Sequence, residues 1–180
     1  CYDSLRPERI KEYIELYKET KAFIDEVYIP DLLAVASYYK DWAGIGGTTN
    51  FLTCGEFPTD EYNLESRFLP QGVIYNRDLG KVENFDGKHI EEHVKYSWFE
   101  GEGKLHPYEG ETKPRFTDLH GEGRYSWMKA PRYKGESVEV GPLAQCLVAY
   151  AKGHPETKAL VDYVLSTLGV GAEALFSTLG

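Results

Sequence analysis

An amphipathic helical pattern over residues 7 to 42 constrains the fold more than any other feature of this chain. The apolar positions that recur there at three- and four-residue steps are Ile10, Ile14, Tyr17, Ile24, Val27 and Tyr28. This spacing is typical of a helix with one buried stripe. Pro7 suits the first helical turn. Pro30 is expected to kink or interrupt the helix near Ile29, because proline has no N–H to donate.

Further helices are predicted in the last third of the chain. One begins at Gly141–Pro142 and ends at Gly153, and the next runs from Pro155 to Gly169. Proline in a first helical turn and glycine just past a last turn are the usual boundary signals. A third helix is expected to begin near Ala172.

The middle of the chain is predicted to be loop-rich. Residues 43–71 contain many glycine and proline residues, which indicates loops. In residues 72–85 apolar and polar residues alternate on both sides of a turn-forming centre at 76–80, which predicts a β-hairpin. The run "GKHIEEHVKYSWF" at 87–99 predicts a short helix, and residues 100–123 a surface excursion.

Together these elements predict an α+β, mainly α fold: an internal segment of a helical bundle with a small β-hairpin insertion. Residues 1–42 would form a long kinked bundle helix, 43–123 a loop-rich insertion, and 124–180 an ordered segment followed by helices. Because the chain opens at Cys1 without a methionine and stops among apolar residues, we expect an internal piece of a longer polypeptide.

Composition excludes several classes of partner. The net charge is −9, from 29 acidic and 20 basic residues, which argues against nucleic acid and anionic membranes. No apolar run has the length of a membrane helix, and the pattern of a signal peptide is not visible in the sequence. The three cysteines, Cys1, Cys54 and Cys146, are too far apart for a C-x-x-C metal motif. Cys146 is predicted to be a small core residue of its helix.

The run "HIEEH" at His89–His93 matches the inverted zinc-peptidase pattern H-x-x-E-H. On a helix, His89 and His93 would face one direction and share a zinc ion, with Glu92 as general base. A zinc hydrolase is therefore one hypothesis. Because a five-residue pattern with two free positions is weak evidence, the favoured reading is an exposed, polar helix face.

The run "RYSWMKAPRYKGESVEVGPLAQ" at 124–145 concentrates aromatic, proline and glycine residues. Its Tyr-Ser-Trp echoes residues 96–98, over too short a length to indicate a structural repeat. Lys129 and Arg132 flank Pro131, and Glu139 lies near enough to meet either cation or a helix N-terminus. These residues predict an ordered, charge-paired support that enters a helix at Gly141–Pro142. If the chain were a whole protein, its aromatic and proline content would favour a non-catalytic interaction module.

The same run closely resembles an interior signature of the large subunit of [NiFe] hydrogenases, K-x-P-R-[YW] followed by E-x-G-P-L-A. "VYIPDLLAVASYYKDW", "LHPYEG" and "ALFSTLG" are also similar to family segments in order and spacing. The resemblance covers essentially the whole chain, and its details look closest to periplasmic uptake enzymes of sulfate-respiring bacteria. It implies an oxidoreductase acting on H₂ that passes electrons to an iron–sulfur small subunit and then to a cytochrome of the c3 type.

Family members hold a nickel–iron centre, with CO and cyanide on the iron, through four thiolates from two C-x-x-C motifs. Neither motif occurs here, so no catalytic residue and no metal ligand is expected in this segment, which alone should be inactive. The resemblance instead implies a structural role for the run at 124–145, in support of the buried centre. The residues we expect to carry it are Lys129, Pro131, Arg132, Glu139, Gly141 and Pro142.

Overall fold

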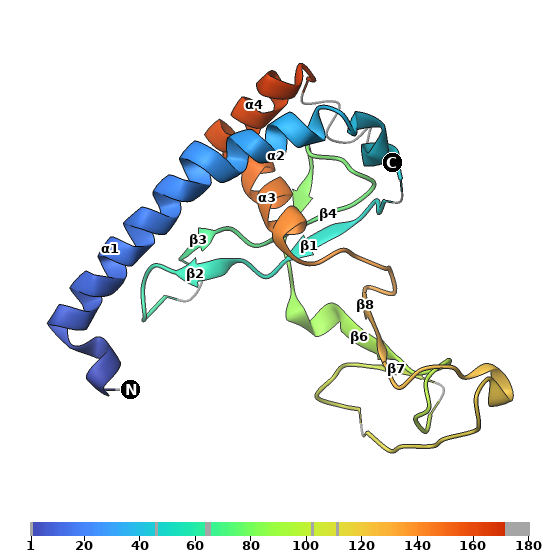
Figure 1. Ribbon diagram of the computed structural model, residues 1–180. Coiled ribbons are helices and arrows are strands. Elements are labelled where there is room, and N and C mark those ends of the chain that lie inside the picture. The colour runs from blue at the N-terminus through green and yellow to red at the C-terminus, as the bar shows by residue number, and fades with distance from the viewer. Residues whose placement is uncertain (1, 46, 64–65, 102, 111, 172–180) are drawn as a thin grey trace. The chain divides into compact units, whose positions relative to one another are not determined.

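The computed structural model describes five stretches of the chain: residues 2–45, 47–63, 66–101, 103–110 and 112–171 (Figure 1). The chain divides into two compact units, residues 1–47 with 160–180, and residues 48–159, and each is described by itself. The division into three segments made from the sequence stays a prediction.

The first unit is helical. Its elements are a 3₁₀ turn at Tyr2–Leu5, α1 at Pro7–Phe23, α2 at Ile29–Ala36, a 3₁₀ turn at Lys40–Gly44, and the part of α4 (Pro155–Leu168) that begins at Leu160. Pro7 stands in the first turn of α1, as predicted. Lys40 Nζ donates to the Leu168 carbonyl at 2.8 Å and so ties α4 to the end of the α2 region.

Helical backbone continues through Pro30 by way of a π-turn at Ile24–Tyr28, in which the Ile29 N–H donates to the Ile24 carbonyl. Proline cannot donate, and its ring crowds the carbonyl four residues earlier, so a normal α-turn would be strained here. The wider turn relieves this crowding. The interruption expected near Ile29 is thus present as a local widening of the helix.

No residue of α1 is buried, and Leu33 is the buried residue of α2. The apolar side chains left exposed along these helices include Ile10, Tyr13, Ile14, Tyr17, Ile24, Val27, Tyr28, Leu32 and Val35. This apolar stripe is therefore uncovered in the described chain. Because helices gain most of their stability from packing an apolar face, covering the stripe would stabilise α1 and α2. The described fold mixes helix and strand, and the mainly helical bundle stays a prediction.

The second unit contains small antiparallel sheets and helix α3. The first sheet has the order β1 (Phe51–Thr53), β4 (Gly72–Ile74), β5 (Val82–Glu83). The second sheet pairs β2 (Glu56–Pro58) with β3 (Arg67–Leu69). The third sheet has the order β7 (Lys104–Leu105), β6 (Ile90–His93), β8 (Ala130–Tyr133). The pairing of β4 with β5 confirms the predicted hairpin. Helix α3 (Pro142–Ala151) lies against β1 and β4 (Figure 1).

The core of the second unit lies between α3 and the first sheet. Its largest fully buried side chains are those of Phe51, Val73, Ile74, Tyr133 and Val148. A side chain at Gly72 could not fit there, because a Cβ would lie 2.6 Å from Val82 and 3.0 Å from Val148. The glycine therefore allows β4 to approach both neighbours.

The prediction of a helix at 87–99 is wrong. A 3₁₀ turn at Gly87–His89, capped by the Asp86 carboxylate on the Lys88 N–H, leads directly into strand β6. Strand β8 supplies the pairing partner for β6 from about forty residues further along the chain. A distant partner of this kind overrides local periodicity.

The third helix expected near Ala172 lies outside the described residues. Within the described stretches, no helix combines the length and the apolar character needed to cross a bilayer.

Candidate functional site

Strand β8 carries Pro131 and Arg132 at the edge of the third sheet. Glu92 of β6 lies opposite Pro131, and Glu91 lies opposite Arg132. An edge position tolerates proline, because no ladder hydrogen bond is lost on the outer side. The guanidinium of Arg132 donates to the Pro131 carbonyl at 2.7 Å. Both residues therefore lie on the outer strand of the third sheet, with the guanidinium folded back onto the adjacent backbone carbonyl.

Lys129, immediately before β8, is the best-anchored of the predicted support residues. Its Nζ lies 3.0 Å from Glu92 Oε2 and donates to Thr112 Oγ1 at 2.9 Å, and its side chain is 15% exposed. The ammonium also lies 5.6 Å from the centre of the Phe99 ring. Lys129 and Glu92 line a cavity of about 60 Å³, which has room for water but is far smaller than the usual pocket for an organic ligand.

Glu139 joins the segment to the first sheet through its backbone. Its N–H donates to the Asn50 carbonyl and its carbonyl accepts from the Leu52 N–H, both at 2.9 Å. Among the described residues no ion pair joins Glu139 to Lys129 or Arg132, so its side-chain role stays a prediction. The structure therefore brings Lys129 together with Glu92 rather than with Glu139.

Gly141 and Pro142 set the entry into α3. Gly141 is the N-cap and has φ 129°, a conformation that side chains rarely adopt. Pro142 occupies the first turn, where its missing N–H leaves no bond unmade. This pair fixes the angle at which the chain passes from the edge of β1 into the helix.

Two four-residue runs, each a cation followed by Tyr-Ser-Trp, lie side by side in register at residues 95–98 and 124–127, and we call them the YSW pair. Ser97 and Ser126 form a parallel bridge, and the Trp98 N–H donates to the Ser126 carbonyl at 2.8 Å. The ring pairs that result are Tyr96 with Tyr125, with centroids 6.1 Å apart, and Trp98 with Trp127, 5.2 Å apart. The echo in the sequence is thus a local pairing of two short runs.

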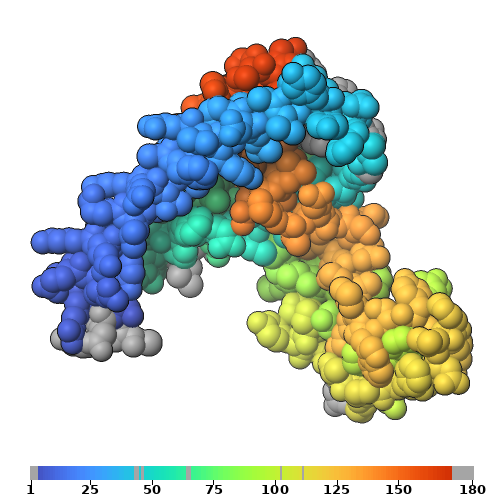
Figure 2. Space-filling model, viewed as in Figure 1, coloured from blue at the N-terminus to red at the C-terminus, as the bar shows by residue number. Residues whose placement is uncertain are grey.

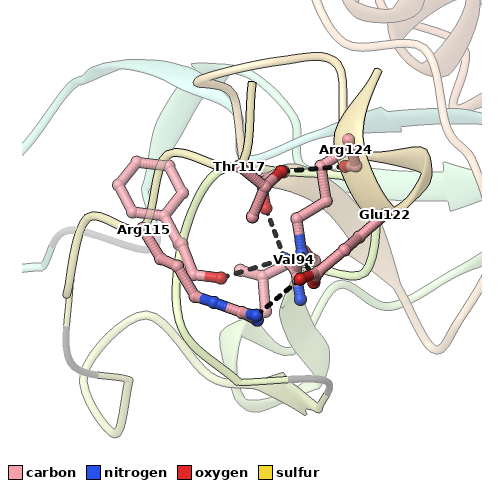
Figure 3. A network of polar contacts seen from close by, with 8 residues as sticks. Val94, Arg115, Thr117, Glu122 and Arg124 are labelled. Carbon is pink, nitrogen blue, oxygen red and sulfur yellow. Dashed lines mark hydrogen bonds and ion pairs between the residues drawn. The ribbon is translucent and has the colours of Figure 1, made fainter. Parts of the chain in front are cut away.

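Arg124, which opens the second run, is the residue that the sequence expectations passed over. It is 5% exposed, and its Nη1 donates to the carbonyls of Val94 at 3.1 Å, Phe99 at 2.9 Å and Ser97 (Figure 3). Glu122 lies 3.9 Å from its Nε. The sequence did contain one sign that this residue matters. A cation, Lys95 or Arg124, precedes Tyr-Ser-Trp in each of the two similar runs.

The zinc site suggested by His89, Glu92 and His93 is not formed. Neighbouring residues of a strand point to opposite faces, so Glu92 and His93 diverge on β6. His93 Nε2 lies 2.9 Å from Glu91 Oε2, whereas Glu92 binds Lys129. The hydrogen bond with His93 lowers the pKa of the Glu91 carboxyl.

The described residues do not fit a nickel centre. No group of three or more His, Cys, Asp or Glu side chains in the described stretches could hold a metal ion. Neighbouring protein atoms partly desolvate the Cys54 and Cys146 thiols and so raise their pKa, which opposes the thiolate form that nickel chemistry requires. The core position predicted for Cys146 is also wrong: α3 buries the side that carries Leu147 and Val148, and Cys146 is exposed.

Comparison with known proteins gives one family. Residues 2–180 match the family described as nickel-dependent hydrogenase. The chain is 37% identical to the uptake hydrogenase large subunit of Rhizobium leguminosarum bv. viciae, over 98% of this chain and 34% of that protein. It is 33% identical to the hydrogenase-1 large chain of Escherichia coli (strain K12), over 96% of this chain and 33% of that protein.

A solved structure agrees with the sequence comparison. The reduced, active form of the Ni-Fe-Se hydrogenase from Desulfomicrobium baculatum superimposes with a TM-score of 0.71 at 31% identity, over 96% of this chain and 37% of that chain. The chain spans about a third of the length of the curated relatives it matches. The resemblance read from the 124–145 run is confirmed, and this chain belongs to the nickel-dependent hydrogenase family.

Proposed function

We propose that this chain is a scaffold segment in the large subunit of a [NiFe] hydrogenase, an enzyme that converts H₂ reversibly to two protons and two electrons. The observation that carries the proposal is the family match along residues 2–180. The relatives and the solved neighbour named above are hydrogenases, which supports the same activity for the protein that contains this chain.

The segment would contribute geometry rather than chemistry. Lys129 joins the start of β8 to Glu92, and Pro131 and Arg132 lie on the outer strand of the third sheet. Glu139 ties the chain to β1, and Gly141–Pro142 sets the angle of α3. Supports of this kind keep a buried centre in a single arrangement. No catalytic step is assigned to a residue of this chain.

The nickel–iron centre, with CO and cyanide on its iron, would be held by cysteines outside this segment, because the described residues do not fit it. Electrons would pass to an iron–sulfur small subunit and then to a cytochrome of the c3 type in the periplasm. The exposed apolar stripe of α1 supports completion of a helical bundle by other helices of the large subunit.

Hydrogen-dependent dye reduction tests the activity. The purified protein that contains this chain should reduce a viologen dye under H₂ and leave it oxidised under argon. Failure to reduce the dye under H₂, after reductive activation, would contradict the proposal.

Nickel content tests the scaffold role. Arg132→Leu should lower the nickel bound per purified large subunit, because outer strand β8 loses the guanidinium that bonds to its Pro131 carbonyl. Lys81→Leu removes an exposed cation from the β4–β5 hairpin and should leave nickel content unchanged. Equal nickel content in both variants and the parent protein would show that Arg132 does not support the centre.

A further inference from the structure

Residues 112–123, which we call the strap, pass over Trp98 without burying any of their own side chains. Their regular structure is limited to the 3₁₀ turn at Gly121–Gly123 and an antiparallel bridge between Pro114 and Phe99. A segment with no buried apolar group depends on the contacts along its edges, so its local stability is low.

Lys129 anchors the beginning of the strap. The same ammonium that pairs with Glu92 at 3.0 Å donates to Thr112 Oγ1 at 2.9 Å. Lys129 is largely covered, whereas Thr112 is exposed. A bond from a charged, largely covered donor is stronger than an ordinary surface hydrogen bond. This contact therefore joins the start of β8, in the third sheet, to the first residue of the strap.

Two backbone hydrogen bonds and two ring contacts, of Phe116 with Trp98 and with Trp127, hold the strap over the YSW pair. The Arg115 N–H donates to the Trp98 carbonyl at 2.9 Å, and the Glu100 N–H donates to the Lys113 carbonyl at 2.8 Å. The Phe116 ring meets Trp98 edge-on, with centroids 5.1 Å apart. Figure 2 shows the yellow residues of this region packed directly on the orange residues that follow it.

Side chains near the end of the strap bond to other residues of the strap. Arg115 Nη2 lies 2.8 Å from Glu122 Oε1, and Thr117 Oγ1 donates to the Gly121 carbonyl at 2.8 Å (Figure 3). These bonds link residues within the strap and would persist if its beginning came loose. The strap therefore has internal bonds that would keep it together as one piece, and it ends at the buried Arg124.

The side chain beneath the strap is that of Trp98. It is 6% exposed, and its indole N–H has no acceptor among the described residues. Opening of the strap would give water access to this side chain.

We propose that the strap opens and closes over Trp98 as a single local segment, and that Lys129 sets its closed population through Thr112. Opening would uncover Trp98 without unfolding the first sheet, whose core residues Val73 and Ile74 are fully buried. The strap is thus a conformational device of the fold, independent of the activity proposed above.

Native-state hydrogen exchange in the purified protein that contains this chain tests the proposal. Thr112→Val keeps the side-chain shape and removes only the acceptor for Lys129. Exchange at the Glu100 and Arg115 amides should become about tenfold faster or more, as expected for the loss of one hydrogen bond to a charged donor. Thr49→Val, an exposed threonine whose hydroxyl bonds to Asn50, should leave both amides unchanged.

The Leu52 amide, bonded to the Glu139 carbonyl in the first sheet, separates local from global opening. Faster exchange at Glu100 and Arg115 with an unchanged Leu52 amide would support the strap. Unchanged exchange at all three amides in Thr112→Val, or an equal rise at all three, would overturn it. Lys129→Arg, which keeps the charge and a donor, should preserve most of the slow exchange.

Discussion

Replacing Arg124 by leucine tests how much of the YSW pair depends on one buried guanidinium. Nη1 has two N–H groups, and three carbonyls share these two donors. The substitution therefore removes about two full hydrogen bonds from a charged donor. Each such bond contributes about 1.5–3 kcal/mol. Leucine recovers part of the loss through its apolar burial. We therefore expect the local opening free energy to fall by about 3 kcal/mol.

The assay is hydrogen exchange at the Trp98 and Tyr125 amides, whose bonds to the Ser126 and Tyr96 carbonyls hold the pair together. A loss of about 3 kcal/mol corresponds to exchange roughly a hundredfold faster. Arg124→Leu should show this acceleration in the intact protein that contains the chain.

Arg115→Leu is the matched control, because Arg115 contacts the same Glu122 from a side chain that is 45% exposed. An exposed ion pair contributes about 0–1 kcal/mol, so exchange at the two amides should change less than about fivefold. Equal effects of the two substitutions, or an acceleration below about tenfold in Arg124→Leu, would refute the argument from burial.

Other residues give independent tests. Gly141→Ala should lower stability by about 1–2 kcal/mol, because φ 129° strains any side chain even though nothing lies within 4 Å of the new Cβ; an unchanged denaturant midpoint would contradict this. His154→Ala should cost about 1 kcal/mol in the same assay, because the imidazole accepts from the Thr157 N–H and hydroxyl at the start of α4, and His154→Asn should recover most of it. His93 lowers the pKa of the Glu91 carboxyl, so this carboxyl should stabilise the fold at pH values above its unfolded-state pKa and lose that effect as the pH falls through its folded-state pKa. In an NMR titration, His93→Leu should raise the pKa of Glu91 toward the ordinary value.

Helix boundaries were the most predictable part of the fold. The helix α3 begins and ends where Pro142 and Gly153 indicated, and the disturbance near Pro30 occurs one turn earlier than the proline itself. These signals are covalent properties of proline and glycine, so they act regardless of what packs nearby.

The strand at 90–93 was not predictable in the same way. Ile90, Val94 and Trp98 recur at four-residue steps, which favours a helix. The pairing of β6 with β8 depends on residues far along the chain, and a local pattern carries no information about such a partner. The zinc hypothesis failed for the same reason.

The candidate site was predicted in part. Lys129 was recognised as a charge-paired residue, but its partner is Glu92, which the sequence grouped with two histidines instead. Arg124 was missed because its acceptors are backbone carbonyls, which are present at every position and leave no mark in the sequence. The family signature located the segment, and the structure shows which of its residues are bonded.

Metal analysis of the purified protein that contains this chain tests the central claim most directly. The protein should hold nickel and iron in near-equal amounts, about one of each per large subunit, once the iron of any iron–sulfur clusters has been subtracted. Zinc without nickel in active, folded protein would contradict the assignment of this segment to a nickel–iron enzyme.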